Sequence, residues 1–136
     1  MHYGYIGLGN LGGHCAACLI RAGFQVTVFD LNPVLAERLV AMGARLANSA
    51  EDLAASVDHV ITCLPSPAVS ENVLRSILPR MKPGATWLEM STLGRDAVLA
   101  LAGLAGAAGV RMLELQVTGG VHLAAQGKIT MLAGGD

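Results

Sequence analysis

This sequence contains few charged residues. Only 14% of its 136 residues are charged, the formal net charge is −1, and residues 1–20 contain no Asp, Glu, Lys or Arg. Without a basic patch or a polybasic run, the composition points away from partners such as nucleic acid or an acidic membrane surface. The hydrophobic content of 53% argues against disorder and is enough for the core of one domain.

Long apolar segments are also missing. The uncharged run at residues 97–110 is shorter than the ~20 residues that span a bilayer, and glycines interrupt it. Residues 1–13 have neither the cationic start nor the continuous apolar centre of a signal peptide. We therefore expect a soluble, cytoplasmic protein. Its mean hydropathy of +0.53 predicts that some apolar surface is covered by something outside this chain.

Cysteines number only three, and an odd count argues for free thiols rather than a disulfide framework. Cys15 and Cys18 have the C-x-x-C spacing that redox and zinc sites share. A zinc site needs two further ligands, and only His14 is nearby. Because both cysteines fall on a predicted helix that packs on a sheet, we favour core thiols and expect no metal.

Segments typical of strands and helices alternate along the whole chain. Apolar or β-branched runs predict strands, and capping residues or terminal glycines delimit predicted helices. The predicted strands are residues 2–9, 24–30, 44–48, 58–65, 83–90, 110–117 and 128–135. The predicted helices are residues 11–23, 32–43, 49–56, 66–81 and 94–109. This order predicts one α/β domain of Rossmann type over residues 1–136, with a doubly wound, mainly parallel sheet.

Polar residues stand at the start of several predicted helices. Asn32, which Pro33 follows, and Ser49 are predicted N-caps. Ser66 and Thr92 follow predicted strands, where each side chain could cap the next helix or contact a ligand at the sheet edge. Both interpretations stay open for these two residues.

Three glycines follow the first predicted strand in the pattern G-x-G-x-x-G. In dinucleotide-binding domains Gly7 would make the tight turn, Gly9 would let the backbone approach a pyrophosphate, and Gly12 would let the helix pack closely. The helix N-terminus would donate N–H groups to phosphate. A tight strand–turn–helix junction without a ligand is the simpler interpretation. A methyltransferase loop is a third interpretation. Such a loop needs only G-x-G and its cofactor has no pyrophosphate, so the full G-x-G-x-x-G pattern argues against it.

Asp30 ends the second predicted strand, at about the spacing from Gly7 that the dinucleotide-binding pattern requires. Its carboxylate would accept hydrogen bonds from the adenosine ribose and would repel a 2′-phosphate. The sequence therefore favours NAD over NADP. Arg45 is the nearest cation that could reverse this preference. Leu64 and Pro65 follow a later strand and would form a wall of the same cleft.

Four ordered segments resemble the β-hydroxyacid dehydrogenase family. This family includes 3-hydroxyisobutyrate and tartronate semialdehyde dehydrogenases and, more distantly, 6-phosphogluconate dehydrogenase. The segments are YIGLGNLG, VITCLPSPAVSENVL, EMSTLGRD and ELQVTGGVHLAAQGKITMLAGG, and they extend along the whole chain. The resemblance implies the NAD-binding domain of an oxidoreductase that transfers hydride between NAD and a small 3-hydroxy acid.

The resemblance also implies roles for individual residues. The pyrophosphate would lie along the glycine-rich loop, the adenosine ribose beside Asp30 and Asn32, and the nicotinamide end near Thr92. Thr118 and the two glycines after it would hold the substrate carboxylate, because a hydroxyl and successive glycine amides can bind an anion. The implied cofactor-binding residues are Gly7, Leu8, Gly9, Asn10, Leu11, Gly12, Asp30, Asn32, Leu64, Pro65 and Thr92, and the implied substrate-binding residues are Thr118, Gly119 and Gly120.

This sequence also departs from the family pattern. Residues 114–116 lack the family's Asp-Ala-Pro, which loosens a preset turn, and Leu123 replaces a usual glycine. Family members continue into an all-helical domain that carries the catalytic lysine and most of a dimer interface. Neither Lys82 nor Lys128 matches that lysine. We therefore expect the helical domain to be absent, the chain to end at a domain junction at residue 136, and the isolated chain to be inactive.

A second hypothesis places the chain in another class. It would be a stand-alone, non-catalytic nucleotide-binding or oligomerisation module that arises from a truncated reading frame. The gene sequence beyond codon 136 would distinguish the two. Under either hypothesis we expect a homo-oligomer, with exchange of the C-terminal strand as one route.

Overall fold

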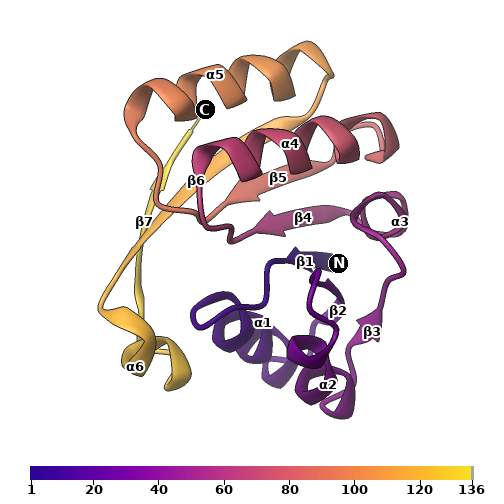
Figure 1. Cartoon of the computed structure of the whole chain (residues 1–136), viewed down its shortest axis with the longest axis vertical. Helices are drawn as coiled ribbons and strands as arrows, with labels where there is room; N and C mark the ends of the chain where they lie inside the picture. The colour runs from indigo at the N-terminus through magenta and orange to yellow at the C-terminus, as the bar shows by residue number, and fades with distance from the viewer. Residues whose placement is uncertain (136) are drawn as a thin grey trace.

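Seven strands form one sheet in the order β3-β2-β1-β4-β5-β6-β7 (Figure 1). The computed structural model describes residues 1–135, so the expected junction at residue 136 lies outside the described residues. The strands are β1 (His2–Ile6), β2 (Gln25–Phe29), β3 (Arg45–Leu46), β4 (His59–Thr62), β5 (Thr86–Glu89), β6 (Arg111–Thr118) and β7 (Thr130–Gly134). Strands β1 to β6 are parallel, and β7 pairs antiparallel with β6. The predicted Rossmann-type α/β fold is confirmed.

Helices cover both faces of this sheet. They are α1 (Gly12–Arg21), α2 (Val34–Ala41), α3 (Ala50–Ser56), α4 (Pro67–Ile77), α5 (Arg95–Ala107) and α6 (Gly120–Ala125), and a 3₁₀ turn, η1 (Leu78–Arg80), follows α4. Figure 1 shows α1, α2 and α6 on one face and α3, α4 and α5 on the other. The central strands β1, β2, β4 and β5 are therefore covered on both sides, which explains their apolar runs in the sequence, whereas both residues of the edge strand β3 are exposed.

Successive strand residues alternate between two hydrophobic cores. Tyr5 packs with α1 and α2 on one face, whereas the next residue, Ile6, packs with α3 and α4 on the other. In β4, Ile61 and Val60 divide in the same way. Trp87 of β5 is fully buried in the second core. The two cores hold the carboxyl ends of β1, β2 and β4 at one edge of the sheet.

Three serine or asparagine side chains act at helix starts. Ser49 Oγ accepts a hydrogen bond from the Asp52 amide at 3.0 Å, and Ser66 Oγ accepts one from the Val69 amide at 3.3 Å. The predicted cap at Ser49 is therefore confirmed, and Ser66 has the capping role that was one of its two open interpretations. Helix α2 begins later than predicted, with Pro33 at its N-cap, but Asn32 Oδ1 still accepts a hydrogen bond from the amide of Val34, the first residue of the helix, at 3.2 Å.

Thr92 does not cap α5, so that interpretation was wrong. The N-cap of α5 is Gly94, and no side chain caps this helix. The Thr92 side chain is exposed in the loop that follows β5. The chain needs two further residues after Thr92 to turn into α5, which leaves the hydroxyl out of reach of the first helical amides.

The segment from residue 114 to residue 125 combines a predicted strand with a helix that was not predicted. Strand β6 runs straight through positions 114–116, in agreement with the strand predicted over residues 110–117, and the departure from the family's proline leaves no loosened turn there. Gln116 Nε2 instead donates to the Leu93 carbonyl oxygen at 3.3 Å and to Glu114 Oε1 at 2.9 Å. Helix α6 was not predicted, because six residues behind a glycine pair carry too short a pattern.

Membrane insertion has no support from the helices. Within residues 1–135, none combines the length and the hydropathy that crossing a bilayer requires.

Candidate functional site

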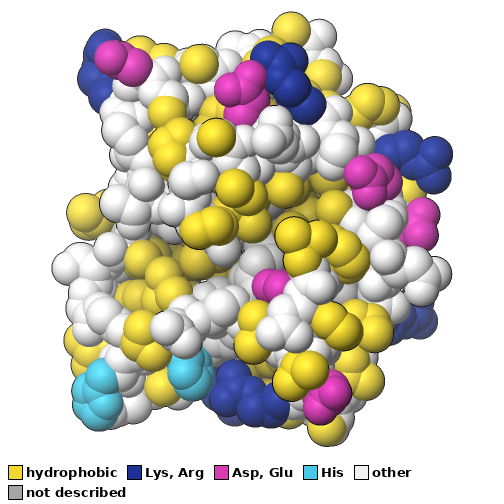
Figure 2. Space-filling model, viewed as in Figure 1, with side chains coloured by type: hydrophobic (Ala, Val, Ile, Leu, Met, Phe, Trp, Pro, Cys, Tyr) yellow, Lys and Arg dark blue, Asp and Glu magenta, His cyan; other side chains and the backbone are white. Residues whose placement is uncertain are grey.

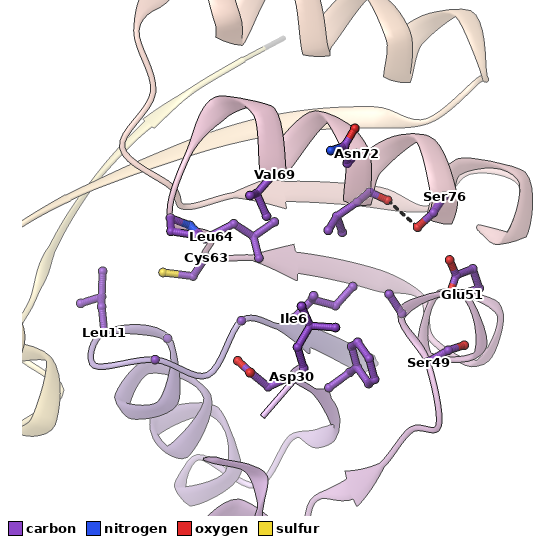
Figure 3. Close-up of a pocket in the computed structure, with 18 of the residues that line it drawn as sticks. Ile6, Leu11, Asp30, Ser49, Glu51, Cys63, Leu64, Val69, Asn72 and Ser76 are labelled. Atoms are coloured by element: carbon purple, nitrogen blue, oxygen red, sulfur yellow. Dashed lines mark hydrogen bonds between the residues drawn. The ribbon is translucent and has the colours of Figure 1, made fainter. Parts of the chain in front are cut away.

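A cavity of about 770 Å³ opens where β1, β2 and β4 end (Figures 2 and 3). Figure 2 shows hydrophobic side chains along the hollowed middle of this face, with most charged side chains toward its margin. The lining comes from three places: the glycine-rich loop after β1, the turn after β2, and the turn after β4 with the following helix α4. The cavity therefore lies beyond the carboxyl ends of parallel strands, the usual ligand position in an open α/β sheet.

Each of the three motif positions requires glycine for a different structural reason. Gly7 has φ +92°, and a Cβ there would collide with the Cys63 carbonyl oxygen. A Cβ at Gly12 would collide with the Gly7 carbonyl oxygen, because α1 packs directly against the loop. A Cβ at Gly9 would meet nothing within 4 Å, since Gly9 faces the open cavity. Gly7 and Gly12 are thus needed by the fold, whereas Gly9 leaves space for a ligand.

Helix α1 begins at this cavity without a cap. Its N-cap residue, Leu11, makes no side-chain hydrogen bond, and the first turn contains no acidic residue. By contrast, serines cap both α3 and α4. The amides of Gly13 and His14 donate to the backbone oxygens of Gly9 and Leu11, whereas those of Asn10 and Leu11 and the positive end of the α1 dipole have no competing side chain, the arrangement that binds phosphate in proteins.

Asp30 lines the cavity just after β2. Its Oδ2 accepts a hydrogen bond from the Leu8 amide at 2.7 Å, and its Oδ1 accepts one from the Asn32 amide at 2.8 Å. The carboxylate thus joins the glycine-rich loop to the turn that follows β2. Each oxygen keeps further acceptor capacity for a ligand hydroxyl. Figure 3 shows this carboxylate on the opposite side of the cavity from Cys63 and Leu64.

The turn after β4 forms the facing wall. Cys63, Leu64 and Pro65 all line the cavity, and the Leu64 amide donates to Ser91 Oγ at 2.8 Å. Burial raises the pKa of the Cys63 thiol to about 11, so this group is a neutral thiol at physiological pH. The wall beside the glycine-rich loop is therefore apolar and uncharged.

Sequence reasoning missed the end of the cavity farthest from α1. Ser49 and Glu51 reach it from the start of α3, and Ser76 reaches it from α4 (Figure 3). A hydrogen bond from its own backbone amide, then one from Ser76, lower the pKa of the Glu51 carboxyl. The lining residues that were not predicted are Ile6, Phe29, Leu31, Ser49, Ala50, Glu51, Cys63, Val69, Asn72, Val73 and Ser76.

A signal for part of this set was present in the sequence. Val69, Val73 and Ser76 are spaced by four and three residues, so they lie on one face of α4. The buried residues Leu74 and Ile77 lie on its other face, against the sheet. A helix that follows a cavity-lining strand therefore offers its less hydrophobic face to the same cavity.

The predicted site residues divide between the cavity and other places. Eight of them line it: Gly7, Gly9, Asn10, Leu11, Gly12, Asp30, Leu64 and Pro65. Leu8 packs into the core instead, while its amide contacts Asp30, and Asn32 is exposed at the start of α2. Exposed Thr92 lies outside the lining. So do Thr118, Gly119 and Gly120, which are exposed where β6 passes into α6.

The cysteines of the C-x-x-C pair lie on α1 but do not line the first cavity. Cys15 is buried, and burial raises the pKa of its thiol. Cys18 is half-buried, and Arg21 Nη2 donates to its sulfur at 2.9 Å. Both line a second, apolar cavity of about 420 Å³ between α1 and the sheet. In the described chain no group of three or more His, Cys, Asp or Glu side chains could hold a metal ion.

Comparison with known proteins gives one consistent family. The model of the NAD-binding domain of 6-phosphogluconate dehydrogenase matches residues 2–136. A probable mitochondrial 3-hydroxyisobutyrate dehydrogenase of Dictyostelium discoideum is 36% identical over 97% of this chain and 42% of its own length. The NAD-dependent L-serine dehydrogenase of Pseudomonas aeruginosa is also 36% identical, over 97% of this chain and 45% of its own length.

A solved structure agrees with the sequence relatives. The 3-hydroxyisobutyrate dehydrogenase of Mycobacterium tuberculosis, solved with L-serine, superposes with a TM-score of 0.96 at 32% identity, over all of this chain and 47% of that one. The chain thus spans a little under half the length of these relatives. With the glycine-rich loop, the uncapped α1 and Asp30 around one cavity, the chain belongs to the family of the NAD-binding domain of 6-phosphogluconate dehydrogenase, whose relatives include the 3-hydroxyisobutyrate dehydrogenases.

Proposed function

We propose that this chain binds NAD in the first cavity and that the complete protein transfers hydride between NAD and a small 3-hydroxy acid. One observation carries this proposal. The open space at Gly9, the uncapped start of α1 and the Asp30 carboxylate surround a single cavity of about 770 Å³. This size lies within the ordinary range for cofactor sites. The NAD-binding family and the 3-hydroxyisobutyrate dehydrogenase relatives support the same reaction class.

The residues present fit the two halves of a dinucleotide. A pyrophosphate at Gly9 would meet the amide groups of Asn10 and Leu11 and the positive end of the α1 dipole. The adenosine ribose would lie at Asp30. Beyond Asp30 the cavity continues to Ser49 and Glu51, which leaves room for the base. When bound, NAD supplies the hydride-accepting ring, and the protein orients it.

The choice of NAD over NADP rests on charge. Asp30 already accepts hydrogen bonds at both oxygens, which holds its carboxylate at the cavity. A 2′-phosphate there would meet this negative charge, and the next two residues, Leu31 and Asn32, supply no cation. Arg45 is exposed on β3 and does not line the cavity. We therefore propose NAD as the cofactor.

The substrate half of the site is proposed at the start of α6. Thr118 offers a hydroxyl, and Gly119 and Gly120 follow it with φ of +110° and +73°. Successive backbone amides in such a turn can bind a carboxylate. The family's catalytic lysine has no counterpart in this sequence. We therefore propose that residues 1–136 supply the cofactor and the substrate carboxylate contacts, and that the purified chain alone does not oxidise a 3-hydroxy acid.

The Asp30→Ala variant tests the cofactor proposal. Calorimetry should show one NAD per unmutated chain and weaker binding of NADP. In Asp30→Ala the affinity for NAD should fall about tenfold to a hundredfold, because hydrogen bonds to a charged group are lost. The ratio of the affinity for NAD to the affinity for NADP should also become smaller in this variant. Asp52→Ala removes an equal charge from an exposed position outside the cavity and should leave both affinities unchanged.

Two results would contradict the proposal. A folded, unmutated chain that gives no heat with NAD or NADP would exclude a nucleotide site. Measurable turnover of a 3-hydroxy acid by the purified chain would exclude the proposed division of roles.

A further inference from the structure

Glu89 is a fully buried carboxyl group that the cofactor site does not use directly. It is the last residue of β5 and has no exposed surface. Its Oε1 accepts a hydrogen bond from the Ser91 amide at 2.7 Å, and its Oε2 accepts one from Thr62 Oγ1 at 3.0 Å. Burying such a group is unfavourable unless its hydrogen bonds are made, and here both oxygens have partners.

The hydrogen bonds of Glu89 continue into a network that ends on the cavity wall. Ser91 Oγ accepts from the Leu64 amide at 2.8 Å, and Ser70 Oγ donates to Ser91 Oγ at 3.3 Å. Of these residues, only Leu64 lines the first cavity. Glu89 therefore reaches the cavity through Ser91.

A second branch of the network contains the one tryptophan of the sequence. Trp87 Nε1 donates to Thr62 Oγ1 at 2.8 Å, and Thr62 Oγ1 then donates to Glu89. The five side chains of this network are all at most 3% exposed: Thr62, Ser70, Trp87, Glu89 and Ser91. Water does not compete for these hydrogen bonds, so the geometry of each member depends on its neighbours.

We propose that Glu89 is a positioning residue for the nucleotide cavity: it holds Ser91, and Ser91 holds the backbone of Leu64 in the turn after β4. This inference rests on the proposed function, because Leu64 faces the nucleotide only if the first cavity binds one. Packing alone does not require a carboxylate, since apolar residues of similar volume fill a core at least as well. What the network adds is a fixed direction for the Leu64 amide and hence for the cavity wall.

The surroundings of the Glu89 carboxyl are consistent with a structural role. Burial raises the pKa of its carboxyl, while hydrogen bonds from Ser91, Thr62 and Ser70 oppose that change. Among the described residues Glu89 does not touch the cavity, so it is not placed to exchange a proton with a ligand there.

Three variants test this role on the whole chain. Ser91→Ala removes the acceptor of the Leu64 amide, and Glu89→Gln replaces an acceptor oxygen with an NH₂ donor that cannot pair with the Ser91 amide and Thr62 hydroxyl as the carboxylate does. Ser56→Ala is the control, because it also deletes a serine hydroxyl, which donates to the Leu53 carbonyl oxygen at 2.8 Å outside the network and outside the cavity lining. Circular dichroism verifies that each variant is folded.

Three measurements report on these variants. Hydrogen exchange of the Leu64 amide reports the positioning itself, calorimetry reports the affinity for NAD, and Trp87 fluorescence reports the Thr62 branch. In Ser91→Ala we expect exchange of the Leu64 amide to speed up about fivefold or more and the Kd for NAD to rise about fivefold to tenfold. Glu89→Gln should do the same and also shift the Trp87 emission. In Ser56→Ala the exchange rate of the Leu64 amide and the Kd for NAD should change less than about twofold.

The outcomes separate two failures. If Ser91→Ala binds NAD as tightly as the unmutated chain, the positioning role is wrong, whether or not exchange of the Leu64 amide changes. If Ser56→Ala weakens NAD binding as much as Ser91→Ala, the effect is general destabilisation and the positioning role is wrong as well. If the unmutated chain binds neither NAD nor NADP, the proposed function falls, and the positioning role falls with it.

Discussion

At the scale of single residues, the three motif glycines answer to different constraints. Gly12 is required by the contact between α1 and the loop, whereas Gly9 borders open space. Within one G-x-G-x-x-G motif, Gly12 is therefore needed for folding and Gly9 for binding a ligand.

Paired alanine substitutions separate these two requirements. Gly12→Ala should lower the free energy of unfolding by about 1–3 kcal/mol, because its Cβ collides with backbone that cannot move freely. Gly9→Ala should change that free energy by less than about 0.5 kcal/mol but weaken NAD binding about tenfold, since the methyl group occupies the ligand's space. Urea denaturation and calorimetry measure the two quantities. Equal stability losses in both variants would contradict this assignment.

Cys63 is a cavity-lining residue whose reactivity depends on its environment. Its pKa of about 11, against an ordinary value of 9.0, lowers the thiolate population at pH 8 about a hundredfold. A more basic thiolate is also more nucleophilic, so alkylation by iodoacetamide should be about tenfold slower than for an unperturbed thiol. Mass spectrometry of the modified peptides gives the rate. The rate should rise with pH and fall when NAD is bound. Fast labelling of Cys63 that NAD does not slow would contradict the prediction.

At the scale of elements, capping distinguishes the helices around the first cavity. Serines cap α3 and α4, and α1 has no cap. A side-chain cap competes with a phosphate for the amide groups at a helix start, and at α1 no side chain does so. The interpretation of Ser66 that the structure favours is therefore the N-cap.

The Ser66→Ala variant tests this interpretation. Loss of the hydrogen bond to the Val69 amide should lower the free energy of unfolding by about 1 kcal/mol, the usual effect of removing a helix cap. NAD affinity, measured by calorimetry, should stay within about twofold of the unmutated chain. A large loss of affinity with unchanged stability would instead make Ser66 a ligand contact.

At the scale of the whole molecule, the sheet order places the first cavity. Strands β1 and β4 are neighbours, although β2 and β3 come between them in sequence, so the chain leaves in opposite directions from this pair. Helices from the two directions lie on opposite faces and leave a crevice between them at the strand ends. The motif glycines after β1 and the Leu64 turn after β4 meet only because of this reversal.

The two edges of the sheet differ in a way that predicts association. Strand β3 has two residues and begins with Arg45, whereas β7 has five residues without charge or proline. Such an uncharged edge is a site for pairing with another strand. We expect the chain to self-associate at high concentration in light scattering.

Matched lysine substitutions test where this association occurs. Leu132→Lys on β7 should make the chain monomeric. Leu99→Lys, at a residue of similar exposure on α5 (54% against 60%), should not. A monomeric unmutated chain at high concentration, or an equal effect of both substitutions, would contradict an interface at β7.

The sequence by itself determined the order of the elements, the glycine-rich loop and Asp30. These features depend on neighbours close along the chain: hydrophobic periodicity, glycines at fixed spacing and a carboxylate at a strand end. The short helix α6 was missed because its six residues carry too little of such a pattern. The strand through positions 114–116 was predicted from its apolar run, but its pairing with β5 and β7 is a property of the assembled sheet.

Only the tertiary structure decided which residues share the first cavity and how its wall is held. Ser49 and Ser76 are both serines at ordinary helical positions, and nothing local relates them to Gly9. The Leu64 amide and Ser91 Oγ are 27 residues apart, and they meet because β4 and β5 are adjacent in the sheet. Strand adjacency is set by the burial of both sheet faces, a property of the whole chain that no short segment contains.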